Sequence, residues 1–157
     1  MIFAQIIKLD TKAIDFVLAF PQADLDVPVS MELPAGMDLA GHGKDSSKYL
    51  LKLKKHLYGL KNSSLNWLNK LKNTFEDRGF VESPSDPCVF ISKDMIIFVY
   101  VDDCILISKD DFTIKKFIDS MKDTPEGFDF TDEGNMNAYL DVNIYSLPYG
   151  KLSCCCC

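Results

Sequence analysis

Residues 95–107 of the chain read MIIFVYVDDCILI, and they constrain its fold more than any other segment. Two acids, Asp102 and Asp103, stand side by side between two apolar runs that are each long enough for a buried strand. Neighbouring side chains of one strand point to opposite faces of a sheet, so two adjacent carboxylates serve one site best at the tip of a hairpin. The segment therefore predicts a rigid β-hairpin with two acids at its tip. These acids are either solvated turn residues, a position that aspartate favours, or part of a metal site.

A third carboxylate interrupts a second apolar run. The run from Ala13 to Phe20 (AIDFVLAF) has the length of a strand and stops at Pro21, which cannot continue a ladder. Burying Asp15 in such a strand costs several kcal/mol unless the carboxylate is paired or binds a cation. If this strand adjoins the hairpin, three carboxylates converge, and Mg²⁺ favours such oxygen ligands. Two ions about 4 Å apart would support phosphoryl transfer by in-line displacement.

The rest of the chain alternates short apolar runs with two amphipathic segments. The runs predict strands at 29–33, Tyr49–Lys55, Cys88–Ser92, Met95–Val101, Cys104–Ser108, Phe128–Phe130 and Ala138–Tyr145. Helices are predicted from Asn62 to Arg78, ending at Gly79, and from Asp110 or Asp111 to just before Pro125. This order predicts an α+β fold, in which helices pack on one face of an antiparallel sheet.

The composition suits one globular domain, because 47% of the 157 residues are apolar and 25% are charged. No run approaches the roughly 18 apolar residues of a membrane helix, and the first residues, MIFAQIIKLD, resemble a signal peptide only loosely. We therefore expect an intracellular, cytoplasmic protein that is not secreted. Cys154 to Cys157 are consecutive, while Cys88 and Cys104 lie within apolar runs, so the pattern is not a disulfide framework. We expect residues 154–157 to be an artefact of cloning, truncation or reading frame.

Positive charge is concentrated in one block, although the formal net charge is −6. From Ser46 to Lys72 the chain has no Asp or Glu and seven lysines. The block is either an ordinary solvated face or a stripe that faces phosphates, because charge of one sign focuses a field that mixed charge would cancel. In the second case the residues that contact nucleic acid would be Lys48, Lys52, Lys54, Lys55 and Lys61.

Several motifs together resemble one known family. Tyr100 to Asp103 (YVDD) resembles the Y-x-D-D signature of reverse transcriptases. Residues 14–36 (IDFVLAFPQADLDVPVSMELPAG), 51–61 (LKLKKHLYGLK) and 76–90 (EDRGF…DPCVF) look like the polymerase of copia-type LTR retrotransposons, in the family's order. The resemblance implies the palm region of an RNA-directed DNA polymerase, with a polymerase palm-like sheet and two-metal nucleotidyl transfer. On this basis residues 1–153 are expected to be a partial palm domain.

The resemblance also implies roles for individual residues. The catalytic aspartates would be Asp15, Asp102 and Asp103, and these three with the backbone carbonyl of Phe16 would bind Mg²⁺ or Mn²⁺. The incoming nucleotide would contact the backbone amides of Leu18, Ala19 and Phe20, and it would pass close to the backbone at Gly59. The Phe20 ring would act as a steric gate against the ribose 2′-hydroxyl. Without the family, Phe20 and Tyr58 would be core aromatics, Gly59 a break between strand and helix, and His56 a surface residue.

The partners implied are an RNA or DNA primer-template, deoxynucleotides and the rest of the retrotransposon polyprotein, with no membrane. Residues 61–67 (KNSSLNW) lack the glutamine, proline and arginine that relatives commonly carry there, and Asp141 replaces a glycine. The chain begins just before the first catalytic strand, so we expect an incomplete polymerase. Two alternatives stay open: an inactive retroelement remnant with at most weak nucleic-acid binding, and a phosphoacceptor receiver domain, which the order of elements disfavours.

Overall fold

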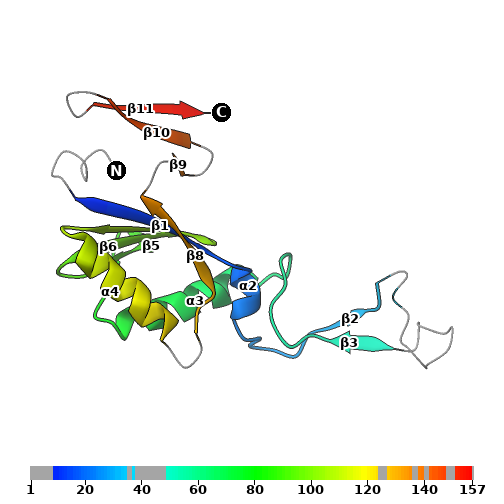
Figure 1. Ribbon diagram of the computed structural model, residues 1–157. Helices are drawn as coiled ribbons and strands as arrows, with labels where there is room; N and C mark the ends of the chain where they lie inside the picture. Colours follow the sequence, from blue (N-terminus) through cyan, green and yellow to red (C-terminus); the bar gives the residue numbers. More distant parts are fainter. Residues whose placement is uncertain are drawn as a thin grey trace.

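The centre of the molecule is a six-stranded sheet in which every neighbouring pair of strands is antiparallel. The computed structural model describes residues 9–34, 37, 49–123, 127–135, 138–139, 142–147 and 151–156, with side chains up to residue 134. Two longer helices, α3 (Ser63–Glu76) and α4 (Asp111–Lys122), lie on the same side of the sheet (Figure 1). The α+β class expected from the sequence is therefore confirmed.

The remaining elements are short. They are β1 (Asp10–Phe16), α2 (Ala19–Gln22), β2 (Ser30–Glu32), β3 (Leu50–Lys52), β4 (Val81–Ser83), β5 (Asp86–Ile91), β6 (Met95–Tyr100), β7 (Asp103–Ser108), β8 (Phe130–Asn135), β9 (Ala138–Tyr139), β10 (Val142–Leu147) and β11 (Lys151–Cys156). The main sheet has the order β4-β5-β6-β7-β1-β8, while β2 pairs with β3 and β10 pairs with both β9 and β11. The first strand of the chain thus lies between β7 and β8.

Some strands differ from those predicted. β1 ends at Phe16 instead of Phe20, because Leu18 adopts a left-handed backbone with φ 51° and ψ 55° and α2 begins directly after it. The strand predicted at Phe128–Phe130 lies later in the chain, as β8, which begins at Phe130 and pairs with β1. The backbone of Cys154–Cys156 forms part of β11, so these residues pair with β10. That they are an artefact stays a prediction.

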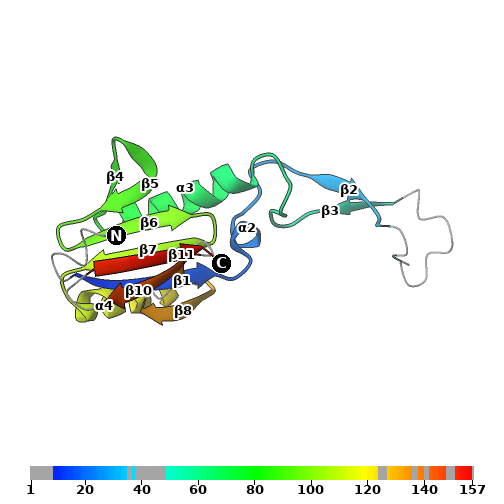
Figure 2. The same ribbon diagram turned by 90° about the horizontal axis from the view of Figure 1, so that it is seen from above.

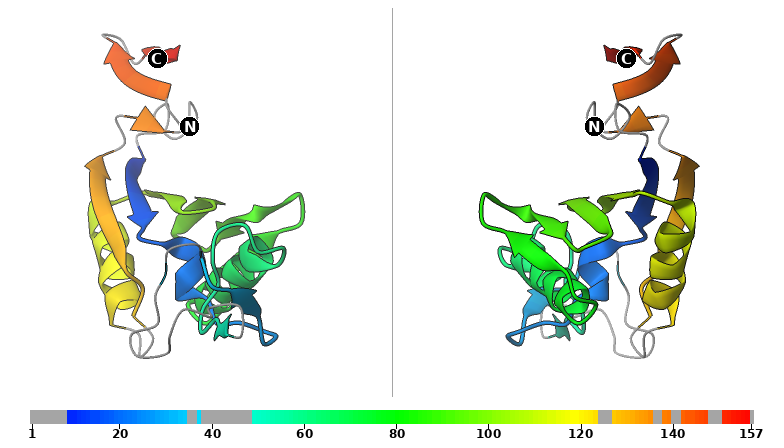
Figure 3. Two further views of the ribbon diagram at one scale, coloured as in Figure 1. Left: turned by 90° about the vertical axis from the view of Figure 1, so that its right-hand side faces the viewer. Right: turned by 90° about the vertical axis from the view of Figure 1, so that its left-hand side faces the viewer.

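The two long helices close one face of the sheet with their apolar sides. The buried residues of α3 are Ser63, Trp67, Leu71 and Phe75, and those of α4 are Ile114, Phe117, Ile118 and Met121. α4 begins as predicted, because the Asp110 side chain accepts a hydrogen bond of 2.8 Å from the Thr113 N–H. Figure 3 shows α4 beside β8 and α3 beside β4 and β5. In the described part of the chain, none of the helices has the length and apolar character needed to cross a bilayer.

Phe75 couples three elements of the core. Its ring centroid lies 5.0 Å from that of Phe90 on β5, 5.9 Å from that of Phe117 on α4, and 6.1 Å from that of Phe80. The side chains of Phe75 and Phe90 have no exposed surface. This aromatic cluster therefore fixes the distance of both helices from the sheet.

The pair β2–β3 projects away from the main sheet, as Figures 1 and 2 show from two directions. The segments that lead into and out of this pair are joined by an isolated β-bridge between Asp24 and Lys55. The side chains of these two residues also form an ion pair. The base of the projecting arm is thus tied together beside α2.

We predict that Phe75→Ala lowers the free energy of unfolding by about 3–5 kcal/mol, because it leaves a cavity among three aromatic rings. The measurement is urea denaturation followed by circular dichroism. The control is Leu65→Ala on the exposed side of the same helix, which should change the free energy by less than about 0.5 kcal/mol. Equal losses in the two variants would contradict the described core.

Candidate active site

Strand pairing brings two of the predicted acids face to face. In the antiparallel register of β1 and β7, Asp15 lies directly opposite Asp103. The neighbouring side chains of Ile14 and Cys104 belong to the core that both helices cover, so the two carboxylates stand together on the other face of the sheet. Both acids are half-buried. The pairing thus unites two carboxylates that lie 88 positions apart, at 15 and 103.

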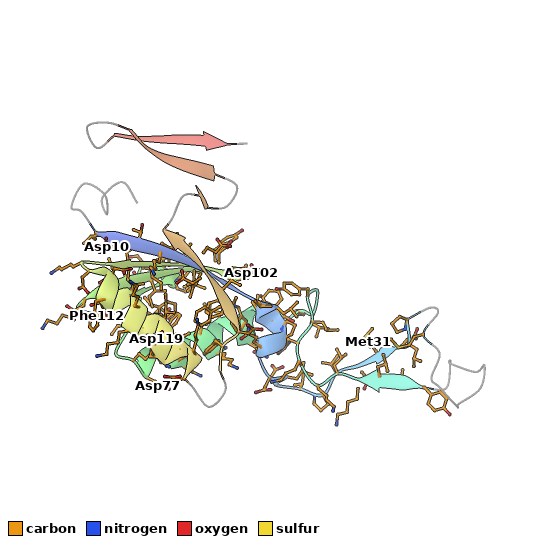
Figure 4. The ribbon with its side chains drawn as sticks, viewed as in Figure 1. Asp10, Met31, Asp77, Asp102, Phe112 and Asp119 are labelled. Atoms are coloured by element: carbon orange, nitrogen blue, oxygen red, sulfur yellow. The ribbon has the colours of Figure 1, made fainter. Side chains whose placement is uncertain are left out.

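Asp102 lies at the tip of the β6–β7 hairpin. It forms the turn together with Val101, and Figure 4 shows it at the end of the sheet nearest α2. The Phe16 N–H donates a hydrogen bond of 2.8 Å to the carbonyl oxygen of Asp102, which ties the turn to the end of β1. The predicted hairpin is therefore confirmed, with its two acids at the tip and at the first residue of β7.

Val101 gives this turn an unusual backbone. Its φ is 58°, in the left-handed region, which costs an ordinary residue about 1–2 kcal/mol. Trp67 of α3 donates a hydrogen bond of 2.6 Å from Nε1 to the carbonyl oxygen of Val101. The sequence places Trp67 close to the apolar side of α3 but gives no sign of this bond, because the two residues are 34 positions apart.

The acids could supply some of the ligands of a divalent cation, with water or substrate as the others. Within the described residues, no three His, Cys, Asp or Glu side chains are close enough together to hold one metal ion. The expected convergence of all three carboxylates on one ion is therefore not found among these residues. The register brings together the carboxylates of Asp15 and Asp103, whose donor atoms are all oxygens. Mg²⁺ usually binds through one or two carboxylates and keeps water or substrate phosphate as its other ligands. The chemistry of this donor set therefore fits Mg²⁺ or Mn²⁺.

The segment after β1 carries three of the predicted nucleotide contacts. Leu18 is 63% exposed and has a left-handed backbone conformation, and Ala19 and Phe20 are the first residues of α2. The Phe20 ring packs against the Tyr58 ring, with centroids 4.5 Å apart and planes tilted by 44°. Phe20 is partly buried and also contacts the main core. Its ring therefore lies at the boundary between core and surface, and Tyr58 supports it.

Tyr58 lies within reach of the acidic residues. Partial burial raises the pKa of its hydroxyl above the ordinary value, and the negative charges of Asp102 and Asp15 raise it further, while a backbone hydrogen bond with Ala19 opposes them. The side chain of Tyr58 is 50% exposed, so it is not the core aromatic that the sequence alone suggests. Its hydroxyl is thus influenced by the two acids and by the backbone of Ala19 in α2.

The loop that carries Gly59 rests on a buried histidine. His56 is buried, and not at the surface as the sequence suggests. Its Nε2 lies 2.9 Å from the Asn66 amide nitrogen and its Nδ1 lies 3.2 Å from Ser63 Oγ, which donates to the Leu57 carbonyl oxygen. Gly59 has φ +93°, and a Cβ there would meet nothing within 4 Å. Glycine is therefore required by the backbone conformation, and the space beside it is open.

The lysine block is not a uniform stripe of unpaired charge. Three of its members are bound within the fold: Lys55 to Asp24, Lys70 to the Gln22 carbonyl oxygen, and Lys72 to Glu76 and Glu82. Lys52, Lys54 and Lys61 are exposed, and no ion pair involves them within the part of the chain that the structure describes. Lys48 and Asp141 lie outside the described residues.

A separate cavity lies away from the acids. It has a volume of about 580 Å³ between α3 and the segment that follows α2, and its lining includes Asn66, Lys70 and Arg78. None of the three predicted acids lines it. The candidate active site is therefore the open surface around the hairpin tip and not this cavity.

Comparison with known proteins places the chain among polymerases of mobile elements. Residues 3–151 match the family described as reverse transcriptase (RNA-dependent DNA polymerase). The chain is 30% identical over 143 residues to the retrovirus-related Pol polyprotein from transposon TNT 1-94 of Nicotiana tabacum, covering 88% of the chain and 10% of that relative. It is 31% identical over 136 residues to the Pol polyprotein from transposon RE1 of Arabidopsis thaliana, covering 84% and 9%.

A yeast relative is more similar over a shorter stretch. The truncated transposon Ty1-A Gag-Pol polyprotein of Saccharomyces cerevisiae is 42% identical over 74 residues, which is 46% of the chain and 6% of that relative. No solved structure matches the chain significantly. The chain spans about a tenth of the length of the plant polyproteins that it matches.

We predict that Asp15→Asn stabilises the protein when no divalent cation is present. Like charges directly opposite on neighbouring strands repel, and such cross-strand pairs are worth about 0.2–1 kcal/mol. Urea denaturation in the presence of a chelator should show a gain of that size. The control is Asp94→Asn, which removes one negative charge at the exposed turn between β5 and β6, away from the paired acids. A gain no larger than that of the control would contradict the repulsion.

Proposed function

The chain belongs to the reverse transcriptase family of copia-type retrotransposons, and from this membership we propose that it supplies the palm of an RNA-directed DNA polymerase. The observation that carries the proposal is the register that sets Asp15 opposite Asp103, next to Asp102 in the turn. We propose that the palm domain spans residues 1–153 and that residues 154–157 are not part of it. Its sheet would serve, as in other palms, as the rigid base for the acids.

The acids would act by holding metal ions in fixed positions. Asp15 and Asp102, with the Phe16 carbonyl, would bind Mg²⁺ or Mn²⁺, while Asp103 would act less directly. When bound, such ions activate an attacking hydroxyl and stabilise charge on the reacting phosphate. The protein's own contribution is rigidity, because the turn is hydrogen-bonded to β1 through Phe16 and to α3 through Trp67. Catalytic carboxylates depend on this kind of positioning.

The nucleotide would bind beside the start of α2. The Phe20 ring, supported by the Tyr58 ring at 4.5 Å, would stand against the ribose and reject a 2′-hydroxyl. The amides of Leu18 to Phe20 would meet the triphosphate. The open space at Gly59 would let the nucleotide pass close to the backbone.

The primer-template would lie over the exposed lysines. Lys52, Lys54 and Lys61 are the members of the block that can neutralise phosphates without first losing an ion pair to a described residue. Lys55 would have to exchange Asp24 for a phosphate, and Lys48 would extend the contact. We further propose that the chain works inside the cell, on RNA or DNA and deoxynucleotides, together with the rest of a Pol polyprotein such as those of its relatives.

Primer extension on an RNA template tests this function. In the presence of Mg²⁺ the chain should add deoxynucleotides to a DNA primer, and Asp102→Asn should lower the rate at least about a hundredfold, because it removes a carboxylate ligand of the ion. Asp94→Asn is the matched control and should extend the primer normally. If the unaltered chain extends no primer with Mg²⁺ or Mn²⁺, either alone or with the upstream segment of a related Pol polyprotein supplied, the polymerase function is refuted and the inactive remnant is the better interpretation.

A further inference from the structure

The turn at the tip of the central hairpin has a conformation that its own residues do not favour. Glycine and asparagine adopt a left-handed backbone readily, whereas a β-branched residue does so rarely. Val101 nevertheless has φ 58°, and it comes directly before the two acids. An interaction outside the turn must therefore stabilise this conformation.

Two hydrogen bonds from other elements provide that interaction. The indole Nε1 of Trp67 donates to the Val101 carbonyl oxygen at 2.6 Å, and the Phe16 N–H donates to the next carbonyl oxygen, that of Asp102, at 2.8 Å. Two successive carbonyl groups of the turn are thus bound to α3 and to β1. The bond from α3 acts on the left-handed residue itself.

The donor is held rigidly in the core. Trp67 is 1% exposed, and its ring packs edge-on against Phe16 at 5.0 Å and against Phe128 at 6.0 Å between centroids. Phe16 follows Asp15 in β1, so the ring that contacts the indole belongs to the strand that carries the other acid. The indole therefore cannot move without disturbing both sides of the site.

We infer that Trp67 is a positioning residue, whose indole N–H holds Val101 in the left-handed conformation and thereby fixes Asp102 in the turn and Asp103 directly after it. The inference rests on the proposed function, because it concerns the same carboxylates. It differs from an ordinary core role of Trp67 in one respect: it depends on the N–H group and not only on the volume of the ring. Removing the N–H while keeping an aromatic ring separates the two.

The test compares Trp67→Phe with the unaltered chain by two measurements. Hydrogen exchange followed by mass spectrometry reports the opening of residues 99–104, and titration with Mn²⁺, followed by electron paramagnetic resonance of the free ion, reports metal affinity. Loss of the N–H leaves a partly buried carbonyl group without this donor, so exchange at the turn should rise about tenfold and Mn²⁺ affinity should fall about tenfold. Exchange at residues 92–94, the turn between β5 and β6, is the internal control and should not change.

A double-mutant cycle links the effect to the backbone of Val101. Asparagine accepts the left-handed conformation at little cost, so in the Val101→Asn background the change Trp67→Phe should alter exchange and affinity by less than about threefold. If Trp67→Phe lowers the stability too far, benzothienylalanine at position 67 keeps the two-ring shape without the N–H. The substitution is specific because Trp67 is the only tryptophan of the chain.

The outcomes separate this inference from the proposed function. Unchanged exchange at the turn, equal increases at both turns, or the same loss in both backgrounds would overturn the role of Trp67. If the unaltered chain binds no Mn²⁺, the proposed metal function fails, and the exchange data alone then decide on Trp67. Faster exchange confined to residues 99–104 would support it even then.

Discussion

The antiparallel pairing of β1 with β7 is the constraint on which the candidate site depends. It aligns the two strands from Asp10 opposite Ser108 to Asp15 opposite Asp103. A slip of one residue would turn every side chain of β1 to the other face of the sheet. Ile14 and Phe16 would then leave the core, where each is at most 2% exposed. The burial of these two apolar residues therefore determines where the acid between them stands.

Phe16 joins this register to the turn. Its N–H binds the Asp102 carbonyl group, and its ring packs against Trp67, which binds the Val101 carbonyl group. The well-packed core thus stabilises two unfavourable features at its surface: a left-handed valine and two like charges on neighbouring strands. Such features are common where a protein gives up stability for function. At this site they are consistent with carboxylates that serve a function.

The parts of the fold that could be predicted are those set by local spacing. The hairpin around Asp102 follows from two apolar runs that flank two acids, and α4 follows from its apolar spacing and the cap at Asp110. β4 was beyond prediction, because its three residues, VES, show no clear pattern. The end of β1 was misplaced because the left-handed backbone of Leu18 is set by its surroundings and not by its side chain.

The candidate site could be predicted only in part, for a related reason. The three acids stand out in the sequence because apolar residues flank them. That β1 adjoins β7 does not follow from the sequence, because this pairing joins distant parts of the chain. The buried His56 and the bond from Trp67 to Val101 also depend on contacts between elements, which single residues do not reveal. The block of lysines is visible in the sequence. Their individual ion pairs, such as that of Lys55 with Asp24, depend on the fold.

The central claim is that Asp15 and the acids at the hairpin tip, Asp102 foremost, hold a divalent cation. The most direct measurement is an NMR titration that follows the indole ¹⁵N–¹H resonance of Trp67, the single tryptophan of the chain. This N–H donates to the carbonyl oxygen of Val101, the residue before Asp102. Mn²⁺ at the acids should broaden this resonance strongly, Mg²⁺ should compete, and Asp15→Asn should abolish the effect. An indole resonance that Mn²⁺ leaves sharp, or broadens equally in the variant, would contradict the account.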